Sequence, residues 1–196
     1  MKIEEGVELS RHTTLGTGGP ARAFAEPETE EEVVGLLRWA RERDLAVAVV
    51  GLGSNLLVAD AGIDALVLKL RGALTRVEVD GDVIRAGAGA ANAVCLHRAR
   101  DAGLGGFEFA CAIPGTIGGG TWMNAGAYGC DFSAVLERAL VATAEGSGWL
   151  TPAELGLSYR HSELKHGQVV LEAELRLRPR RSEEIRAEVR ELNTRR

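Results

Sequence analysis

Apolar residues at helical spacing mark the first regular element of the chain. Behind Thr29, apolar side chains recur three or four residues apart, at Val33, Leu36, Leu37 and Ala40. Thr29 can cap the N-terminus of this helix, and Glu32 completes a capping box. The next run, Leu45–Val50, is continuously apolar and predicts a short strand buried on both faces, by this helix and by whatever lies behind it.

Short apolar segments separated by turn residues predict β-structure in the middle of the chain. Three segments fit strands: 65–70, 75–80 and 83–90. The Asp80-Gly81 pair between the last two is a hairpin turn, because glycine adopts the positive φ that tight hairpin turns need. We therefore expect an antiparallel pair here.

The last third of the chain predicts another hairpin and one longer strand. Residues 139–144 and 149–150 flank the turn sequence at 145–148. Val169–Leu177 alternates between apolar side chains and charged ones, which predicts a half-buried antiparallel strand that ends before Pro179.

Two further helices have recognisable ends. Asn92 is expected to cap a helix over residues 93–102, with Gly103 as its C-terminal stop. Ser182 is expected to cap the last helix, whose apolar stripe consists of Ile185, Val189 and Leu192. With the strands, these helices indicate an α+β fold.

The stretch Gly105–Gly129 follows neither the helical nor the strand period and has Glu108 as its only carboxylate. Several of its glycines could turn peptide N–H groups toward one anion: Gly115, Gly118, Gly119 and Gly120. Pro114 stiffens the entrance and biases Ile113 toward an extended conformation. A phosphate cradle and a loop that uses glycine only for clearance fit this stretch about equally well.

Two other loops carry glycine and hydroxyl groups. Gly51–Val58 follows a predicted strand, but Leu56 stands where a dinucleotide fingerprint has its third glycine, so the Rossmann interpretation fails. Ser54 and Asn55 could still donate to phosphate oxygens. An ordinary turn between strands explains this loop equally well, and a surface connection explains Thr13–Pro20 better than a site does.

Composition removes several classes of function. The chain has 196 residues, 45% hydrophobic and 26% charged, with a net charge of -5, so neither nucleic acid nor an anionic membrane is expected as a partner. No apolar run is long enough to span a bilayer, and three cysteines without metal-like spacing favour a reducing, cytoplasmic setting. The four histidines are scattered, so no metal site is expected.

Four segments taken together resemble the UDP-N-acetylenolpyruvoylglucosamine reductase family over essentially the whole chain. They are Thr17–Ala21, Gly51–Val58 (GLGSNLLV), Ile113–Gly129 (IPGTIGGGTWMNAGAYG) and Tyr159–Ser162 (YRHS). The third segment is highly specific, whereas GxGSN is found across the wider flavin fold.

The resemblance implies a two-lobed FAD-binding domain of the vanillyl-alcohol-oxidase (PCMH) type with flavin between the lobes. It implies lobes at 1–70 and 71–180, and a connecting helix at 181–196 toward a substrate-binding domain that this chain lacks. The implied cofactor-binding residues are Thr14, Gly51, Gly53, Ser54, Asn55, Leu56, Ile113, Pro114, Gly115, Thr116, Gly118, Gly119, Asn124, Gly126 and Tyr159.

The same resemblance implies an activity: NADPH reduces FAD, and hydride passes to the enolpyruvyl double bond of a UDP-sugar. The product is the UDP-N-acetylmuramate of peptidoglycan synthesis, and hence of cell-wall biogenesis, cell shape, cell cycle and division. Arg160 matches the family's catalytic arginine, whose charge suits an enolate-like intermediate. From the residues alone, a solvated charge is the better explanation of Arg160.

The sequence also departs from the family. A serine in a GS-FKNP-like motif and a glutamate near the C-terminus assist catalysis in the family, and neither motif occurs here. We therefore expect a fragment or truncated product, a monomer that binds FAD and is inactive alone. Two alternatives stay open: a non-catalytic flavin-binding module, and another oxidoreductase of the same fold. The second is disfavoured because neither glycine loop has a histidine for covalent flavin attachment.

Overall fold

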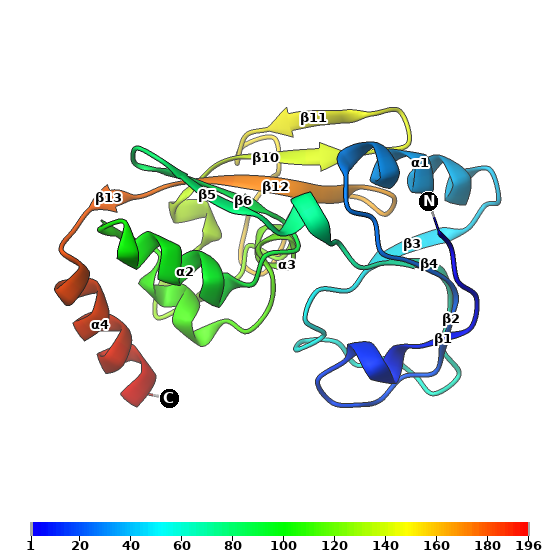
Figure 1. Ribbon diagram of the computed structural model, residues 1–196, viewed down its shortest axis with the longest axis horizontal. Helices are drawn as coiled ribbons and strands as arrows, with labels where there is room; N and C mark the ends of the chain where they lie inside the picture. Colours follow the sequence, from blue (N-terminus) through cyan, green and yellow to red (C-terminus); the bar gives the residue numbers. More distant parts are fainter. Residues whose placement is uncertain (1, 196) are drawn as a thin grey trace.

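The computed structural model describes residues 2–195, which form two sheets joined by a shared core (Figure 1). The smaller sheet has the order β1-β2-β4-β3. Its strands are β1 (Val7–Glu8), β2 (Pro20–Ala25), β3 (Ala46–Val49) and β4 (Ile63–Leu68). Strands β2, β4 and β3 run parallel, while β1 pairs with β2 antiparallel. All four strands therefore come from the first 68 residues.

The larger sheet is antiparallel, with the order β11-β10-β12-β6-β5. Its strands are β5 (Val77–Asp80), β6 (Val83–Gly87), β10 (Leu136–Ala142), β11 (Ser147–Leu150) and β12 (Val169–Arg176). Two small pairs complete the β-structure: β7 (Leu104–Gly105) with β13 (Arg178–Pro179), and β8 (Gly126–Ala127) with β9 (Cys130–Asp131). Both predicted hairpins, β5-β6 and β10-β11, are confirmed.

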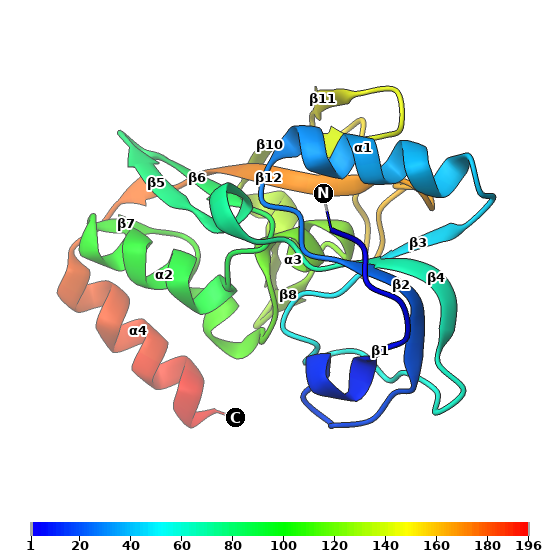
Figure 2. The same ribbon diagram turned by 45° about the vertical axis from the view of Figure 1, so that its right-hand side comes forward.

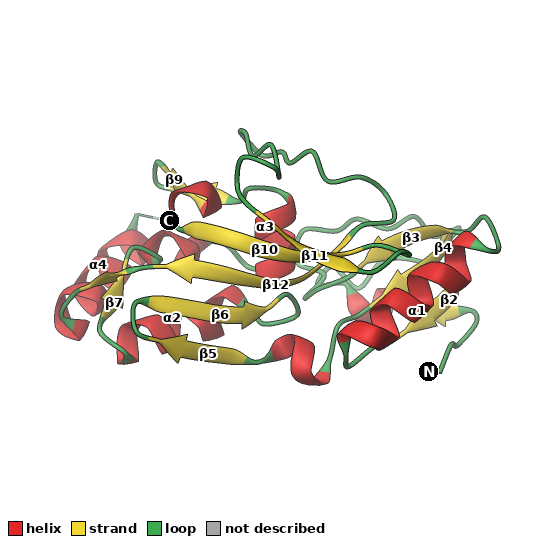
Figure 3. Cartoon of the chain, turned by 90° about the horizontal axis from the view of Figure 1, so that it is seen from above, coloured by secondary structure: helices red, strands yellow, loops and turns green. Residues whose placement is uncertain are grey.

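In the described part of the chain, four α-helices pack around these sheets: α1 (Glu30–Arg41), α2 (Asn92–Asp101), α3 (Ile117–Trp122) and α4 (Ser182–Thr194). Short 3-10 turns lie at Leu9–His12, Gly72–Thr75, Glu108–Ala112 and Phe132–Ala134. Helices α2 and α3 lie under one face of the larger sheet, with α4 outside α2 (Figure 3). The three predicted helices are confirmed, and α3 was not expected.

Helix α3 forms inside the glycine-rich stretch, against the helical propensity of its three glycines. Packing explains it, because a Cβ on Gly118 would lie 2.8 Å from the Ala88 side chain and one on Gly120 would lie 2.2 Å from the Phe132 ring. Phe132 belongs to a buried edge-to-face trio with Phe107 and Phe109. Close approach to the core, absent from any local sequence pattern, makes this segment helical.

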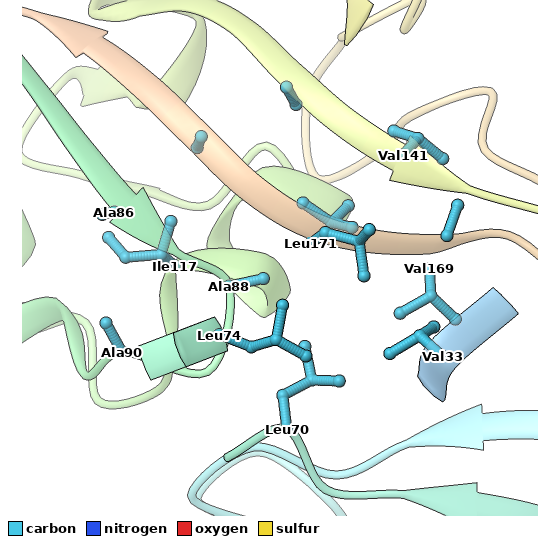
Figure 4. Close-up of a cluster of buried hydrophobic side chains, with 14 of the residues drawn as sticks. Val33, Leu70, Leu74, Ala86, Ala88, Ala90, Ile117, Val141, Val169 and Leu171 are labelled. Carbon is cyan, nitrogen blue, oxygen red and sulfur yellow. The ribbon is translucent and has the colours of Figure 1, made fainter. Parts of the chain in front are cut away.

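Helix α1 connects the two sheets. Its side chain Val33 lies beside Val169 of β12 in the core, as Figure 4 shows. The Arg38 Nε donates to the Ala144 carbonyl at 2.7 Å, and Arg41 forms an ion pair with Glu145. The helix thus follows β2 of the smaller sheet in sequence and contacts strands of both sheets.

Two details of strand burial differ from the predictions. Strand β3 is an edge strand with Val49 43% exposed, so it is not buried on both faces; the buried centre of that sheet is β4 (Figure 2). Strand β12 is antiparallel as predicted, yet Glu174 on its polar face is only 5% exposed. Glu174 is buried because Arg85 and Arg138 on the neighbouring strands bind its carboxylate.

Three helix starts also differ in detail. Thr29 accepts from the Glu32 amide as predicted, but the Glu32 carboxylate accepts from the Glu28 amide and so closes the capping box one residue early. Asn92 is the first residue of α2, not its cap. Ser182 is likewise inside α4, and its hydroxyl donates to the Arg100 carbonyl. In the last two cases tertiary acceptors take the side chains away from local capping.

Glu174 joins three strands of the larger sheet. It stands opposite Arg85 of β6 and Arg138 of β10, and its carboxylate accepts from both guanidinium groups at 3.0 Å. The hydrogen bonds from Arg138 are the main cause that lowers the pKa of Glu174. The neighbouring Glu172 has no such partner, and burial raises its pKa.

We predict opposite effects for these two neighbours. Glu174→Gln should lower the free energy of unfolding at pH 7 by about 1–2 kcal/mol, since a buried acceptor of charged hydrogen bonds is lost while the half-exposed arginines are partly rehydrated. Glu172→Gln should leave that free energy unchanged or raise it. Urea denaturation of both variants measures this.

The pH dependence of Glu174 has a defined sign. Its pKa is lower in the folded protein than in the unfolded chain, so its contribution is present above the unfolded pKa and is lost as pH falls through the folded pKa. The difference in unfolding free energy between wild type and Glu174→Gln should therefore shrink in acid. A difference that is constant between pH 7 and pH 3 would contradict this explanation.

Candidate functional site

The first glycine loop lies at the carboxyl edge of the parallel strands of the smaller sheet. Residues 51–58 continue directly from β3, and this edge is where ligands bind in open parallel sheets. Its three leucines face outward, with Leu52 49%, Leu56 39% and Leu57 80% exposed, while Val58 packs against the core. Such an apolar loop surface is typical of a site that a flat, largely apolar group covers.

Gly53 holds this loop against the preceding Thr13–Gly18 loop. Its φ is +69°, and a Cβ there would lie 2.0 Å from the His12 carbonyl oxygen, so no other residue fits without moving the backbone. Thr14 N–H donates to the Gly53 carbonyl at 3.1 Å, and the Thr14 and Ser54 hydroxyl oxygens are 3.5 Å apart. Three predicted site residues, Thr14, Gly53 and Ser54, are thus brought together.

The second glycine loop touches the first. Asn55 Nδ2 donates to the Pro114 carbonyl at 2.7 Å. A Cβ on Gly51 would lie 2.6 Å from the Thr116 hydroxyl oxygen, so the lack of a side chain at Gly51 permits this approach. Two loops that are about 60 residues apart in sequence therefore form one surface between the two sheets.

Several backbone amides on this surface have no protein acceptor. In the first loop, no acceptor within residues 2–195 receives the amide protons of Gly53, Ser54 or Asn55. In the second, the described part of the chain offers none to Gly115, Thr116 or Gly119. Ile117 and Gly118 differ, because their amides donate to the carbonyls of Ala90 and Ala88.

The free amides match what an anion such as a phosphate requires, because several N–H groups without a protein acceptor lie on two loops that touch each other. Gly118 cannot contribute its amide, and its missing Cβ serves the approach to Ala88 instead. The other predicted residues of the second loop, Ile113 and Pro114, contribute carbonyl groups that accept from Asn92 and Asn55. Leu56, in the first loop, has an exposed side chain.

Arg160 lies at the tip of a tight turn. Ser158 and His161 exchange both backbone hydrogen bonds, which leaves Tyr159 and Arg160 as the two central residues. Arg160 has a φ of +54° and donates from Nη2 to the Gly126 carbonyl, while Tyr159 is 88% exposed. The backbone of Arg160 is thus fixed by the turn, and within residues 2–195 its guanidinium has a single hydrogen-bond acceptor, the Gly126 carbonyl.

Asn124 connects this turn to the end of α3. Its side chain is 3% exposed, donates to the Ser158 carbonyl at 3.0 Å and accepts from the Ser133 amide at 2.9 Å. In this structure Asn124 therefore orients the Arg160 turn. Gly126 lies beside it and supplies the carbonyl that Arg160 binds.

Sequence reasoning missed two features of the site. Asn92, interpreted as a cap, instead donates from Nδ2 to the Ile113 carbonyl at 3.1 Å, supporting the second loop from beneath. His12, interpreted as one of several scattered histidines, contacts Lys69 Nζ through Nδ1 at 3.2 Å and stacks on Phe24. Burial and the neighbouring ammonium group lower the pKa of His12. In the sequence, the only signal for the Asn92 hydrogen bond is the general tendency of a buried asparagine to form one.

Other kinds of site find little support in residues 2–195. No group of three metal-binding side chains occurs in this part of the chain. No helix there is both long and apolar enough to cross a bilayer. Burial raises the pKa of the Cys95 thiol to about 12, so this cysteine is not a nucleophile. A cavity of about 710 Å³ beside α4 is lined by residues such as Phe109, Tyr128 and Leu192, and no residue of 51–58 or 113–120 lines it.

The chain is similar in sequence to proteins of a known family. A family model described as an FAD binding domain matches residues 21–149. UDP-N-acetylenolpyruvoylglucosamine reductase 2 of Symbiobacterium thermophilum is 43% identical over 180 residues, which cover 91% of this chain and 58% of that protein. The reductase of Limosilactobacillus reuteri is 41% identical over 198 residues, covering 100% of this chain and 66% of the relative.

Solved structures agree with these relatives. The crystal structure of UDP-N-acetylenolpyruvylglucosamine reductase (MurB) from Thermus caldophilus has a TM-score of 0.87 and 35% identity, covering 100% of this chain and 69% of that one. A solvent-stable cholesterol oxidase, with a TM-score of 0.69 and 19% identity over 90% of this chain, shares the fold.

The chain spans about three fifths to two thirds of the length of the curated relatives it matches. The matches to the Limosilactobacillus reuteri relative and to the Thermus caldophilus structure cover 100% of this chain. The chain belongs to the UDP-N-acetylenolpyruvoylglucosamine reductase family and contains its FAD-binding domain.

Proposed function

We propose that this chain binds FAD across the contact between its two glycine loops. We further propose that it is the flavin-binding part of a cytoplasmic enzyme that reduces UDP-N-acetylglucosamine enolpyruvate to UDP-N-acetylmuramate with NADPH. The relatives carry the name of this reductase. The observation in this chain that supports the binding site most directly is the environment of Gly119.

Neither backbone conformation nor packing within the protein requires glycine at position 119. It lies within α3, where glycine costs about 1 kcal/mol relative to alanine. Gly119 is exposed, and the nearest atom to a Cβ placed on it would be the Thr116 hydroxyl oxygen, 3.7 Å away. Its neighbours Gly118 and Gly120, by contrast, are required by close packing. The open space at Gly119, next to the free amides of Gly115 and Thr116, fits a bound phosphate group.

The chain's own residues then have separable roles. The amides of both loops and the hydroxyls of Thr14 and Ser54 would hold the phosphates of FAD, while Asn55 keeps the loops in contact. Bound FAD would supply the hydride carrier between NADPH and the double bond. Arg160 provides a permanent positive charge that suits a carboxylate on which negative charge develops.

The first test replaces Gly119 by alanine. In the protein without flavin, Gly119→Ala should raise the free energy of unfolding by up to about 1 kcal/mol, because alanine favours the helix and its Cβ meets nothing. The affinity for FAD should fall at least tenfold, because the Cβ occupies the phosphate space. Urea denaturation and fluorescence titration with FAD measure the two effects.

Gly120→Ala is the matched control. Its Cβ would lie against the Phe132 ring, so we expect a loss of stability without flavin, opposite in sign to Gly119→Ala. If Gly119→Ala binds FAD as tightly as wild type, the phosphates do not lie over α3 and the proposed site is wrong.

The second test concerns turnover by residues 1–196 alone. Purified with FAD, this polypeptide should show the visible absorption bands of bound flavin. It should not oxidise NADPH in response to the enolpyruvyl substrate, because the sequence contains neither the serine motif nor the glutamate that the family uses. Substrate-dependent NADPH oxidation at a rate typical of an enzyme, about 1 per second or more, would refute the inactivity.

A further inference from the structure

Backbone strain is concentrated around the Arg160 turn. Within residues 2–195, four residues other than glycine have a positive φ, and three of them lie in one network: Asn124 at 39°, Tyr128 at 56° and Arg160 at 54°. The fourth, Asp44, follows the end of α1. A side chain in this region costs of order 1 kcal/mol and persists where surrounding contacts enforce it. The contacts that enforce it here can be followed atom by atom.

A short hairpin joins Arg160 to α4. Arg160 Nη2 donates to the Gly126 carbonyl, in strand β8. Strand β8 pairs with β9, so that Tyr128 lies at the tip of the intervening turn. The Tyr128 hydroxyl donates to the Leu192 carbonyl at 2.7 Å, in the last turn of α4. The β8-β9 hairpin thus contacts the Arg160 guanidinium through strand β8, and it contacts α4 through the Tyr128 hydroxyl at its turn.

The hydroxyl bond is the contact that holds Tyr128. Its side chain is 41% exposed, so burial alone does not fix it. The Leu192 carbonyl lies in the last turn of α4, where it also accepts from the Arg195 amide at 3.3 Å. The hydroxyl bond therefore joins the β8-β9 turn to a helix end that is already capped.

We propose that Tyr128 is a positioning residue that couples the last turn of α4 to Arg160. When α4 is docked, the hydroxyl bond holds the β8-β9 hairpin, and the hairpin holds the Gly126 carbonyl to which Arg160 binds. When that bond is absent, the Ser158–His161 turn loses the acceptor that orients its guanidinium. The proposal rests on the proposed function in so far as Arg160 meets substrate, but the coupling itself exists without flavin.

The test uses trypsin on the full chain, because trypsin cleaves after Arg160 once that turn opens. Tyr128→Phe retains the ring and removes the hydroxyl bond. Cleavage after Arg160 should become at least threefold faster, measured by mass spectrometry well below the unfolding temperature. Cleavage after Arg138, which lies within β10, reports global unfolding and serves as the internal reference.

Thr194→Val is the matched control. The Thr194 hydroxyl donates to the Glu191 carbonyl at 2.7 Å, so this variant also removes a hydroxyl bond from the last turn of α4, without contact to the hairpin. Cleavage after Arg160 should stay at the wild-type rate. Equal acceleration in both variants, or none in Tyr128→Phe, would overturn the coupling.

Hydrogen exchange provides a second readout that does not depend on protease access. The amides of Ser158 and His161, which bond to each other's carbonyls, should exchange at least threefold faster in Tyr128→Phe than in Thr194→Val. Equal exchange would overturn the proposal. An FAD titration of the same variants separates the two hypotheses, because failure of wild type to bind FAD would refute the proposed function and leave the exchange result unaffected.

Discussion

The contact between the two glycine loops is the constraint on which the rest of the site depends. Asn55 donates to the Pro114 carbonyl, and Thr116 occupies the space that a side chain on Gly51 would fill. Each loop alone presents a few unpaired amides, which water could satisfy. Held together, they present amides from both loops to one region between the sheets, and binding an anion there requires little further ordering.

The core explains why that contact is rigid. Helix α1 packs its Val33 beside Val169 of the larger sheet, and Arg38 binds the Ala144 carbonyl, so the two sheets share one apolar interior. Helix α3 is pressed onto Ala88 and Phe132 by glycines that allow the approach. The loops are therefore mounted on packed elements, which is the usual way in which a binding loop obtains a fixed geometry.

Glycines in this chain act for different physical reasons, and the sequence does not distinguish them. Gly53 has a positive φ and a close backbone neighbour, Gly120 allows a ring to pack, and Gly119 has neither requirement. Asn92 and Ser182 show the same ambiguity for polar residues. Both have the signature of a helix cap, and both use their side chains on distant carbonyls instead. Local preference is weak where a tertiary acceptor is within reach.

The sequence by itself determined the helices with full apolar stripes, the two hairpins and the family, because periodicity, turn residues and motif order are local properties of the chain. Only the tertiary structure decided that β3 is an edge strand, that a run of glycines is helical, and which amides remain free. Each of these depends on what packs against a segment from elsewhere in the chain. The same holds for Arg160, whose sequence context indicates a solvated charge and whose acceptor, Gly126, lies 34 residues away.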